Sequence, residues 1–245
     1  NYSTLDHIFL LKNFIDIFVK NSNQKLYCAF VDYKKAFDTV WRSGLWYKLI
    51  NSGITGKLYN VIVNMYKNIK SCVNSDGNLS DFFISVNGVR QGENMSPFLF
   101  ALFVNDIEQF LVQYGCSPVE ITGANIEIYL KLLIIMYADD TVLFASSKES
   151  LQRCLNGLKD YCDKWKLQIN ADKTKIIIFS KRKVDPQNIN LTIGDTNLEI
   201  VDEFTYLGVT FTHTGNFNKN LQALQEKGNR AIFSIIKRLE MKAYQ

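Results

Sequence analysis

Three aspartates stand at the ends of apolar runs, where a charged side chain is costly. Asp32 follows the run LYCAFV, and Asp139 with Asp140 follows IIMYA. Charges beside buried strands are tolerated when they are paired or bind a metal. Carboxylates brought together from two strand ends form the oxygen-only environment that Mg²⁺ prefers. The pattern predicts a site in which two Mg²⁺ ions, about 4 Å apart, activate a hydroxyl and stabilise departing pyrophosphate.

Each of these features also has an ordinary explanation. An Asp-Asp pair is common in a hairpin turn, and a lone aspartate at a strand end is often a cap or a surface charge. Either feature alone favours the ordinary explanation. The apolar runs before both features, taken together, favour the metal site.

The elements that must position these carboxylates alternate irregularly between helix and strand. Apolar residues at 3.6-residue spacing predict helices over 6–20, 43–52, 56–68, from 96, from 146 and over 218–239. Short apolar or alternating runs predict strands over 25–32, 175–179, 191–193, 198–201 and 206–211, a hairpin over 69–89 about Asp76-Gly77, and a strand-turn-strand unit over 129–145. This order predicts an α+β fold with antiparallel hairpins, rather than a doubly wound parallel sheet.

Three helix starts have recognisable capping chemistry. Ser3 or Thr4 precedes the first helix, and Ser96 with Pro97 combines a capping hydroxyl with proline at the first helical position. Ser146 with Glu149 predicts a capping box.

The composition is that of a folded globular protein and excludes disordered and collagen-like classes. The chain has 245 residues, of which 47% are hydrophobic, 21% charged and 3 proline. Its five scattered cysteines include no C-x-x-C pair, which predicts reduced, mostly buried thiols in an intracellular protein. No run of about 18 apolar residues predicts a membrane span. A net charge of +4 is a weak sign of an anionic partner, although basic residues concentrate in 148–183 and 217–245.

Five segments together resemble the ordered motifs of reverse transcriptases. FVDYKKAFDTVW around Asp32, GVRQGENMSPFLFALFVND from Gly88 and YADDTVLFA around Asp139 resemble motifs A, B and C. LQINADKTKIIIFS resembles motif D, and EFTYLGVTF resembles motif E, the primer grip. The residues of these motifs are most similar to those of non-LTR, LINE-like retrotransposons, and the resemblance covers nearly the whole chain.

The resemblance implies a right-hand polymerase palm, with an antiparallel sheet and packed helices, partial fingers and the start of a helical thumb. We expect a fingers-remnant helix in 1–24, a palm with inserted fingers helices in 25–212 and the start of the thumb in 213–245. Family members carry more of the fingers before the helix at 6–20, so we expect a truncated enzyme.

The implied activity is RNA-directed DNA polymerisation, in which dNTPs are added to a primer 3′-hydroxyl by two-metal phosphoryl transfer. The implied cofactor is Mg²⁺, as two ions, with Mn²⁺ as a substitute. The implied partners are an RNA template, a DNA primer, dNTPs and other domains of the same polyprotein, with no membrane. The implied location is intracellular, in the nucleus or the cytoplasm.

The resemblance also assigns roles to individual positions. Catalysis and metal binding fall to Asp32, Asp139 and Asp140. Nucleotide binding falls to Tyr33 (through its backbone N–H), Phe37 (as a steric gate against the 2′-hydroxyl), Gln91, Gly92 and Lys173 (through the departing pyrophosphate). The primer grip is Tyr206, Leu207 and Gly208, and the template and nucleic-acid backbone contacts are Arg90, Ser96, Lys227 and Arg230.

Several of these positions have plainer explanations that remain open. Phe37 could be an ordinary core residue, Lys173 a solvated lysine and the segment at Tyr206 an ordinary hairpin strand. Glu93-Asn94 stands where the family more often has a small or apolar residue.

Two other functions also remain open. The first is a degenerate or truncated retroelement fragment that binds nucleic acid without catalysis. The second is an RNA-dependent RNA polymerase, which shares the palm but usually has Gly-Asp-Asp and a polar residue at the gate position.

Overall fold

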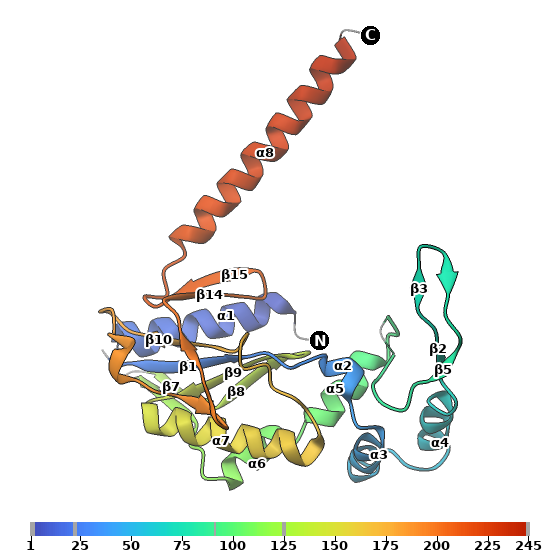
Figure 1. The fold of residues 1–245 in the computed structure, drawn as a ribbon. Helices are drawn as coiled ribbons and strands as arrows, with labels where there is room; N and C mark the ends of the chain where they lie inside the picture. The colour runs from blue at the N-terminus through green and yellow to red at the C-terminus, as the bar shows by residue number, and fades with distance from the viewer. Residues whose placement is uncertain (1–2, 22–23, 91, 124–125, 244–245) are drawn as a thin grey trace.

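A five-stranded sheet forms the centre of the molecule (Figure 1). The computed structural model describes residues 3–21, 24–90, 92–123 and 126–243. The sheet has the order β13-β10-β1-β9-β8, and all its pairings are antiparallel except that of β10 with β13. Its strands are β1 (Leu26–Val31), β8 (Ile134–Tyr137), β9 (Asp140–Ala145), β10 (Lys175–Phe179) and β13 (Glu199–Ile200). The predicted α+β class with antiparallel pairing is confirmed.

Helices cover both faces of this sheet, which explains why β1 is apolar throughout. Alternate side chains of a strand point to opposite faces. Ala29 of β1 belongs to the core on the side of α7 (Lys148–Trp165), whereas Cys28 and Phe30 belong to the core on the side of α1 (Thr4–Ile15). Figure 1 shows α1 above the sheet and α7 below it.

Helix α1 begins as expected. Ser3 is its N-cap, and Ser3 and Asp6 form a reciprocal capping box. The helix ends at Ile15 and continues into a π-helical segment, Asp16–Asn21.

Between β1 and β8, the predicted helices over 43–52 and 56–68 and the predicted hairpin over 69–89 are confirmed. The helix predicted from residue 96 is divided into two, and a short helix directly after β1 was not predicted. The helices are α2 (Ala36–Thr39), α3 (Arg42–Asn51), α4 (Gly56–Met65), α5 (Ser96–Val104) and α6 (Ile107–Gln113). The hairpin pairs β2 (Lys70–Ser71) with β5 (Phe83–Ile84) and β3 (Asn74–Ser75) with β4 (Asn78–Leu79). It projects beyond α4 as a separate ribbon (Figure 1).

A buried lysine joins α3 to the body of the molecule. Lys48 is 4% exposed, and its ammonium donates to the Phe103 carbonyl (2.5 Å), to Asp106 Oδ1 and to the Tyr161 hydroxyl (both 2.6 Å). The same ammonium lies 3.7 Å from the ring centroid of Trp165. Burial lowers the pKa of Lys48 to about 8, against the opposing effect of Asp106. Because these partners lie on α5, on α7 and at the N-cap of α6, the contact joins α3 to all three helices.

Three sequence predictions about local structure are wrong. Ser96 is the first residue of α5 rather than its cap, because Met95 is the N-cap and makes no side-chain capping bond. The cap of α7 is Ser147, whose side chain accepts from the Ser150 amide, and not Ser146. The segment 206–211 is two strands rather than one: β14 (Glu203–Tyr206) turns into β15 (Val209–Thr212).

The remaining strands form small hairpins. β6 (Val119–Gly123) pairs with β7 (Ile126–Leu132), a pairing that the sequence did not predict. The predicted strand over 191–193 is confirmed in shorter form, since β11 (Thr192–Ile193) pairs with β12 (Thr196–Asn197).

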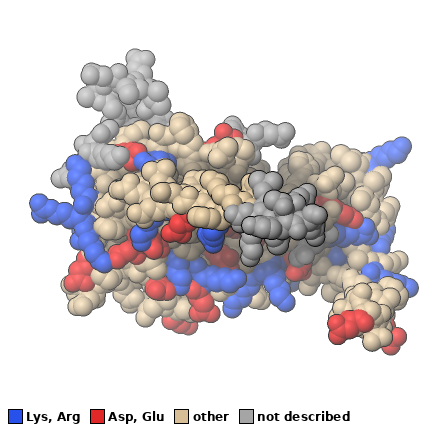
Figure 2. All heavy atoms as spheres, turned by 90° about the horizontal axis from the view of Figure 1, so that it is seen from above, with Lys and Arg blue, Asp and Glu red and all other residues tan. Residues whose placement is uncertain are grey.

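The last helix, α8 (Asn218–Ala243), extends away from the body (Figure 1). Nearly all of its described side chains, up to residue 236, are exposed. Figure 2 shows the molecule from above, where Lys and Arg side chains gather over parts of the visible surface, with acidic side chains between them. All five cysteines are free thiols, and four of them are buried, as predicted. Within the described ranges, no helix is long and apolar enough to cross a membrane.

Candidate active site

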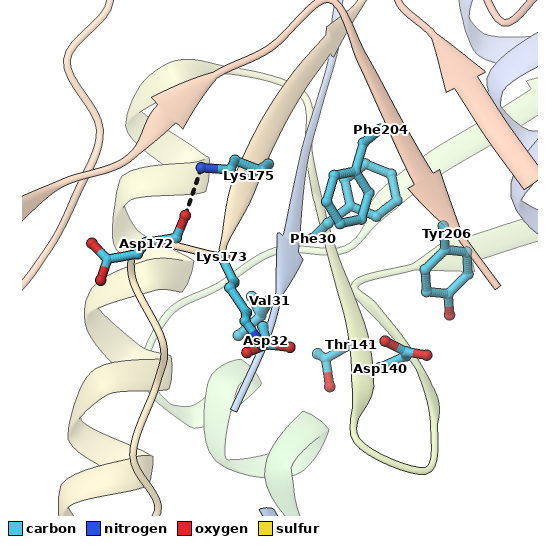
Figure 3. Close-up of a pocket in the computed structure, with 10 residues that line it drawn as sticks. All are labelled: Phe30, Val31, Asp32, Asp140, Thr141, Asp172, Lys173, Lys175, Phe204 and Tyr206. Atoms are coloured by element: carbon cyan, nitrogen blue, oxygen red, sulfur yellow. Dashed lines mark hydrogen bonds between the residues drawn. The ribbon is translucent and has the colours of Figure 1, made fainter. Parts of the chain in front are cut away.

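The three aspartates singled out by the sequence lie at neighbouring strand ends. Val31, the last residue of β1, is opposite Thr141 of β9, so Asp32 follows at the level of Asp140. A cavity of about 340 Å³ opens there, and both Asp32 and Asp140 line it (Figure 3). Asp139 lies in the turn that joins β8 to β9.

The segment 168–174 fixes the backbone at Asp32 from both sides. The Asp32 amide donates to Thr174 Oγ1 (3.2 Å), and the Asp32 carbonyl accepts from the Asn170 amide (2.8 Å). Thr174 is fully buried, and its hydroxyl donates to the Asn170 carbonyl (2.8 Å). Thr174 is a positioning residue that the sequence analysis did not find, because a threonine among lysines gives no signal of burial.

The β8–β9 turn holds Asp139 in a tight two-residue loop. Tyr137 pairs with Asp140, which leaves only Ala138 and Asp139 between the strands. Ala138 has φ +53°, in the left-handed region that favours glycine. Such a residue costs of order 1 kcal/mol and persists only where its surroundings hold it in place.

Burial and the neighbouring carboxylates alter the ionisation of Asp140. The pKa of Asp140 is raised, first by desolvation and then by the negative charges of Asp139 and Asp32. Mutual repulsion among carboxylates with oxygen-only donors fits a hard divalent cation such as Mg²⁺. Within the part of the chain that the structure describes, no three His, Cys, Asp or Glu side chains are close enough to form a ready metal-binding group. The donor chemistry fits the predicted metal, although no preassembled cage is present.

Two lysines near this cavity differ in their contacts. Lys175 donates to the Asp172 carbonyl and pairs with Glu199 (both 2.6 Å). Lys173 is exposed and extends along the cavity wall on the side of Asp32 (Figure 3). No ion pair of Lys173 is found among the described residues, so its ammonium can interact with an incoming anion.

The β14–β15 hairpin forms the opposite wall of the cavity. Tyr206 is buried, and its hydroxyl has no hydrogen-bond partner among the described residues. Burial, and then the charge of Asp140, raises the pKa of Tyr206. Leu207 (φ +48°) and Gly208 (φ +81°) form a two-residue turn with both residues in the left-handed region. Of the three predicted primer-grip residues, Tyr206 therefore lines the cavity, and Leu207 and Gly208 form the turn that follows it.

A second cavity, of about 460 Å³, joins the residues that resemble motifs A and B. It is lined by Phe37, Arg90, Gly92, Glu93, Asn94, Ser96 and Pro97. Phe37 is half-buried, and its ring lies 4.9 Å from that of Phe100, so it is both a packing residue and part of the cavity wall. Gly92 has φ +83° and open space where a side chain would be, which lets a ligand approach its backbone closely. Gln91, also predicted to bind nucleotide, lies outside the described residues.

Arg90 and Ser96 are engaged within the protein. The Arg90 guanidinium pairs with Glu93 (2.6 Å) and donates to the Met65 carbonyl (2.9 Å). Ser96 is 2% exposed and donates to the Arg90 carbonyl (2.5 Å). Both residues shape the loop before α5, and their predicted contacts with template stay predictions.

Tyr33, predicted to bind nucleotide through its backbone N–H, directly follows Asp32. The ring is buried, and burial is the main cause of the raised pKa of Tyr33. Tyr33 forms an isolated antiparallel bridge with Ile169, in which the flanking residues carry the hydrogen bonds, including Lys34 N–H to the Gln168 carbonyl (2.7 Å). In such a pair the central amide points away from its partner. The Tyr33 amide therefore points toward the β8–β9 turn.

The structure places ten of the predicted site residues in three groups. Asp32, Asp140, Lys173 and Tyr206 share the first cavity, whereas Phe37, Arg90, Gly92 and Ser96 share the second. Lys227 and Arg230 lie apart from both, exposed on α8.

Solved structures of telomerase from two Candida species share this fold. The chain matches apo telomerase of Candida tropicalis with a TM-score of 0.54 and 18% identity, over 86% of this chain and 38% of that one. Telomerase of Candida albicans in complex with a fragment of telomeric RNA gives a TM-score of 0.52 and 13% identity, over 88% and 34% of the two chains.

Two of the curated relatives come from mobile elements of Drosophila. The chain is 29% identical over 203 residues to an RNA-directed DNA polymerase from the mobile element jockey of Drosophila funebris, covering 80% of this chain and 21% of that protein. It is 29% identical over 216 residues to a Pol polyprotein from the type-2 retrotransposable element R2DM of Drosophila melanogaster, covering 84% and 20%. The chain thus spans about a fifth of the length of these relatives.

The family model described as reverse transcriptase (RNA-dependent DNA polymerase) matches residues 3–211, which include both cavities and all three aspartates. The chain belongs to the reverse transcriptase family, and the two curated relatives above are proteins of mobile elements.

Proposed function

We propose that this chain carries the polymerase centre of a retrotransposon reverse transcriptase, which adds dNTPs to a primer 3′-hydroxyl along an RNA template. The supporting observation is the placement of Asp32 and Asp140 on the wall of one cavity, with Asp139 in the adjoining turn. Phosphoryl transfer requires alignment of the reacting groups and neutralisation of charge more than covalent chemistry by the protein.

Asp32, Asp139 and Asp140 would hold two Mg²⁺ ions, with Mn²⁺ as a substitute. When bound, such ions activate the primer hydroxyl and stabilise the charge on the leaving pyrophosphate. A bound cation would offset the carboxylate repulsion that contributes to the raised pKa of Asp140 and would favour its ionised form.

The chain's other residues would orient the reactants. The Tyr33 amide, directed toward the β8–β9 turn, would donate to the incoming triphosphate. Lys173 would neutralise or protonate the departing pyrophosphate from the wall of the first cavity. Phe37 would stand under the sugar and exclude a 2′-hydroxyl, with Gln91 and Gly92 beside the nascent base pair.

Nucleic acid would be held by the parts around this centre. The turn formed by Tyr206, Leu207 and Gly208 would position the primer 3′ end. Arg90 and Ser96 would shape the loop under the template, and Lys227 and Arg230 on α8 would bind duplex phosphates without reading sequence.

This assignment divides the chain as the sequence predicted. Residues 1–24 would be a fingers remnant, 25–212 the palm with inserted fingers helices and 213–245 the start of the thumb. RNA template, DNA primer, dNTPs and other domains of a polyprotein would be its partners, in the nucleus or the cytoplasm.

Primer extension tests the proposal. The purified chain is incubated with poly(rA), an oligo(dT) primer, dTTP and Mg²⁺, and we expect extension that Asp139→Ala abolishes. Omission of Mg²⁺ should also abolish extension, and Mn²⁺ should restore it. Equal extension by Asp139→Ala would overturn the assignment of the centre.

The same assay separates the two rival functions. Salt-sensitive binding of primer-template without extension would favour a fragment that binds nucleic acid, a result that the exposed basic helix α8 would explain. Incorporation of rNTPs at the rate of dNTPs, unchanged by Phe37→Ala, would favour an RNA polymerase.

A further inference from the structure

We propose that His7, on the N-terminal helix α1, is a positioning residue that holds the outer edge of β8 and thereby fixes the turn bearing Asp139. This inference rests on the proposed function. It assigns a role in that reaction to a helix outside the motifs with which the aspartates were identified.

The support begins with the position of β8 at the edge of the sheet. β8 pairs with β9 on one side, and the sheet ends there. An edge strand leaves alternate backbone groups without a partner strand. Its conformation is therefore less constrained than that of β1, which has a strand on each side.

The register shows which backbone group faces the open edge. A two-residue turn is closed by a hydrogen-bonded pair, here Tyr137 with Asp140. Hydrogen-bonded and non-bonded pairs alternate, so the neighbouring pair of Met136 with Thr141 is non-bonded. The Met136 carbonyl therefore points outward, away from β9.

His7 contacts this outward carbonyl. Its Nε2 lies 3.0 Å from the Met136 carbonyl oxygen, and because a carbonyl only accepts, Nε2 carries the proton. The His7 ring also meets the ring of Tyr137 edge-on, with centroids 5.3 Å apart at 78°. One side chain thus contacts the last two residues of β8 before the turn.

The turn is a place where such support matters. Ala138 follows Tyr137 directly and has φ +53°, a conformation that its surroundings must impose. β9 holds one leg of the turn and has β1 on its far side. The other leg is β8, and the His7 contact holds its free edge.

His7 itself is held in register by the start of α1. Ser3 and Asp6 form the capping box one turn earlier, so the Asp6 carboxylate is engaged by the Ser3 amide (2.6 Å). Burial lowers the pKa of His7, which favours the neutral imidazole with a single N–H donor.

Three substitutions separate the donor from the ring. His7→Gln keeps a donor at similar reach but loses the ring. His7→Phe keeps the ring but loses the donor, and His7→Ala loses both. Asn13→Ala is the matched control, because it removes a side-chain hydrogen bond to the Phe9 carbonyl on the same helix, and Asn13 makes no hydrogen bond to β8 among the described residues.

Steady-state primer extension measures the effects of these substitutions on kcat and on KM separately. We expect His7→Ala and His7→Phe to lower kcat about 10-fold with KM for dTTP changed less than about 2-fold, since misplacement of a reacting group costs rate rather than binding. We expect His7→Gln to recover to within about 3-fold of the parent and Asn13→Ala to match the parent. Loss in His7→Gln equal to that in His7→Ala would overturn the proposal.

Hydrogen exchange supplies a readout that does not depend on activity. In the free chain, the peptide covering 134–141 should lose protection in His7→Ala and His7→Phe but keep it in His7→Gln, while α7 stays protected in all variants. Unchanged exchange over 134–141, or uniform loss across the fold, would overturn the positioning role. If the parent chain does not extend primer, the proposed function fails, and this exchange pattern still decides whether His7 holds β8.

Discussion

The two carboxylate-bearing strand ends of this site are supported in opposite ways. Asp32 directly follows the central strand β1, and its amide and carbonyl are both bonded to the segment 168–174. Asp139 lies in a two-residue turn at the sheet edge, behind Ala138 with its positive φ. The first end is fixed by several redundant bonds. The second depends on few contacts, so substitutions near it should alter activity more readily than stability.

The largest expected effect distinguishes the carboxylates themselves. Asp32→Asn should lower the rate of single-turnover primer extension by at least ~10³-fold, because the substitution removes a charge at the firmly held position. Asp140→Asn should lower this rate only about 10-fold, because Asp140 is the more exposed carboxylate and its raised pKa disfavours the ionised form that binds a cation. Equal losses would show that the two strand ends contribute alike.

Circular dichroism controls for folding in both variants. Asn differs from Asp by one group and keeps its size, so both variants should retain the parent's far-UV spectrum. A spectrum that changes with Asp32→Asn would mean that its rate loss reports unfolding.

The next effect tests the redundancy at Asp32. Thr174→Val removes the acceptor for the Asp32 amide while keeping the shape of a fully buried side chain. A buried amide without an acceptor costs about 1–3 kcal/mol, measured as the free energy of unfolding in urea. Because the Asn170 amide still donates to the Asp32 carbonyl, we expect extension to fall only about 3-fold.

Thr196→Val is the matched control for this substitution. Thr196 is exposed on β12, so the same change should alter the free energy of unfolding by less than about 0.5 kcal/mol. A loss of extension by Thr174→Val as large as that of Asp32→Asn would contradict the redundancy.

The sequence predicted the aspartates of the site better than the contacts that hold these aspartates in place. Asp32 and Asp139 were found because each follows an apolar run. A continuous apolar run predicts a buried strand from one sequence alone. The burial of Thr174 depends on a partner 142 residues away, and no local pattern encodes that contact. The contact of His7 with Met136 spans 129 residues and is hidden for the same reason.

Local signals failed where two choices were chemically equivalent or where the usual residue was absent. Ser146 and Ser147 are both good caps, and only tertiary packing decides between them. The turn at 207–208 was missed because Leu207 takes a left-handed position that usually carries asparagine, aspartate or glycine. The nucleotide and primer-grip assignments came from motif resemblance, and assays of the substitutions must test them.

A smaller effect tests the strain in the β8–β9 turn. Glycine adopts a positive φ without the penalty that alanine incurs, so Ala138→Gly should raise the free energy of unfolding by up to about 1 kcal/mol. The same freedom loosens the placement of Asp139, and we expect kcat to fall about 3-fold. Urea unfolding and steady-state extension measure the two changes, and a loss of stability would show that the turn is not strained at Ala138.

The smallest effect is the pH dependence that Asp140 contributes to stability. Its folded pKa is raised above the ordinary value of 3.8, so its contribution is present at acid pH and is lost as the pH rises through the folded pKa. Asp140→Asn has no charge to desolvate and avoids this loss. Its thermal midpoint should therefore exceed that of the parent by more at pH 7 than at pH 4, without added metal.

Adding Mg²⁺ at pH 7 should reverse this difference. A cation that binds the folded carboxylates stabilises the parent by mass action, and the effect should weaken when Asp140 is neutralised. The Asp32→Asn chain should respond least, because it lacks the carboxylate at the more firmly held strand end. An equal rise in the midpoint of all three chains would mean that Mg²⁺ acts elsewhere on the protein, and the contrast between the two strand ends would then have no bearing on metal binding.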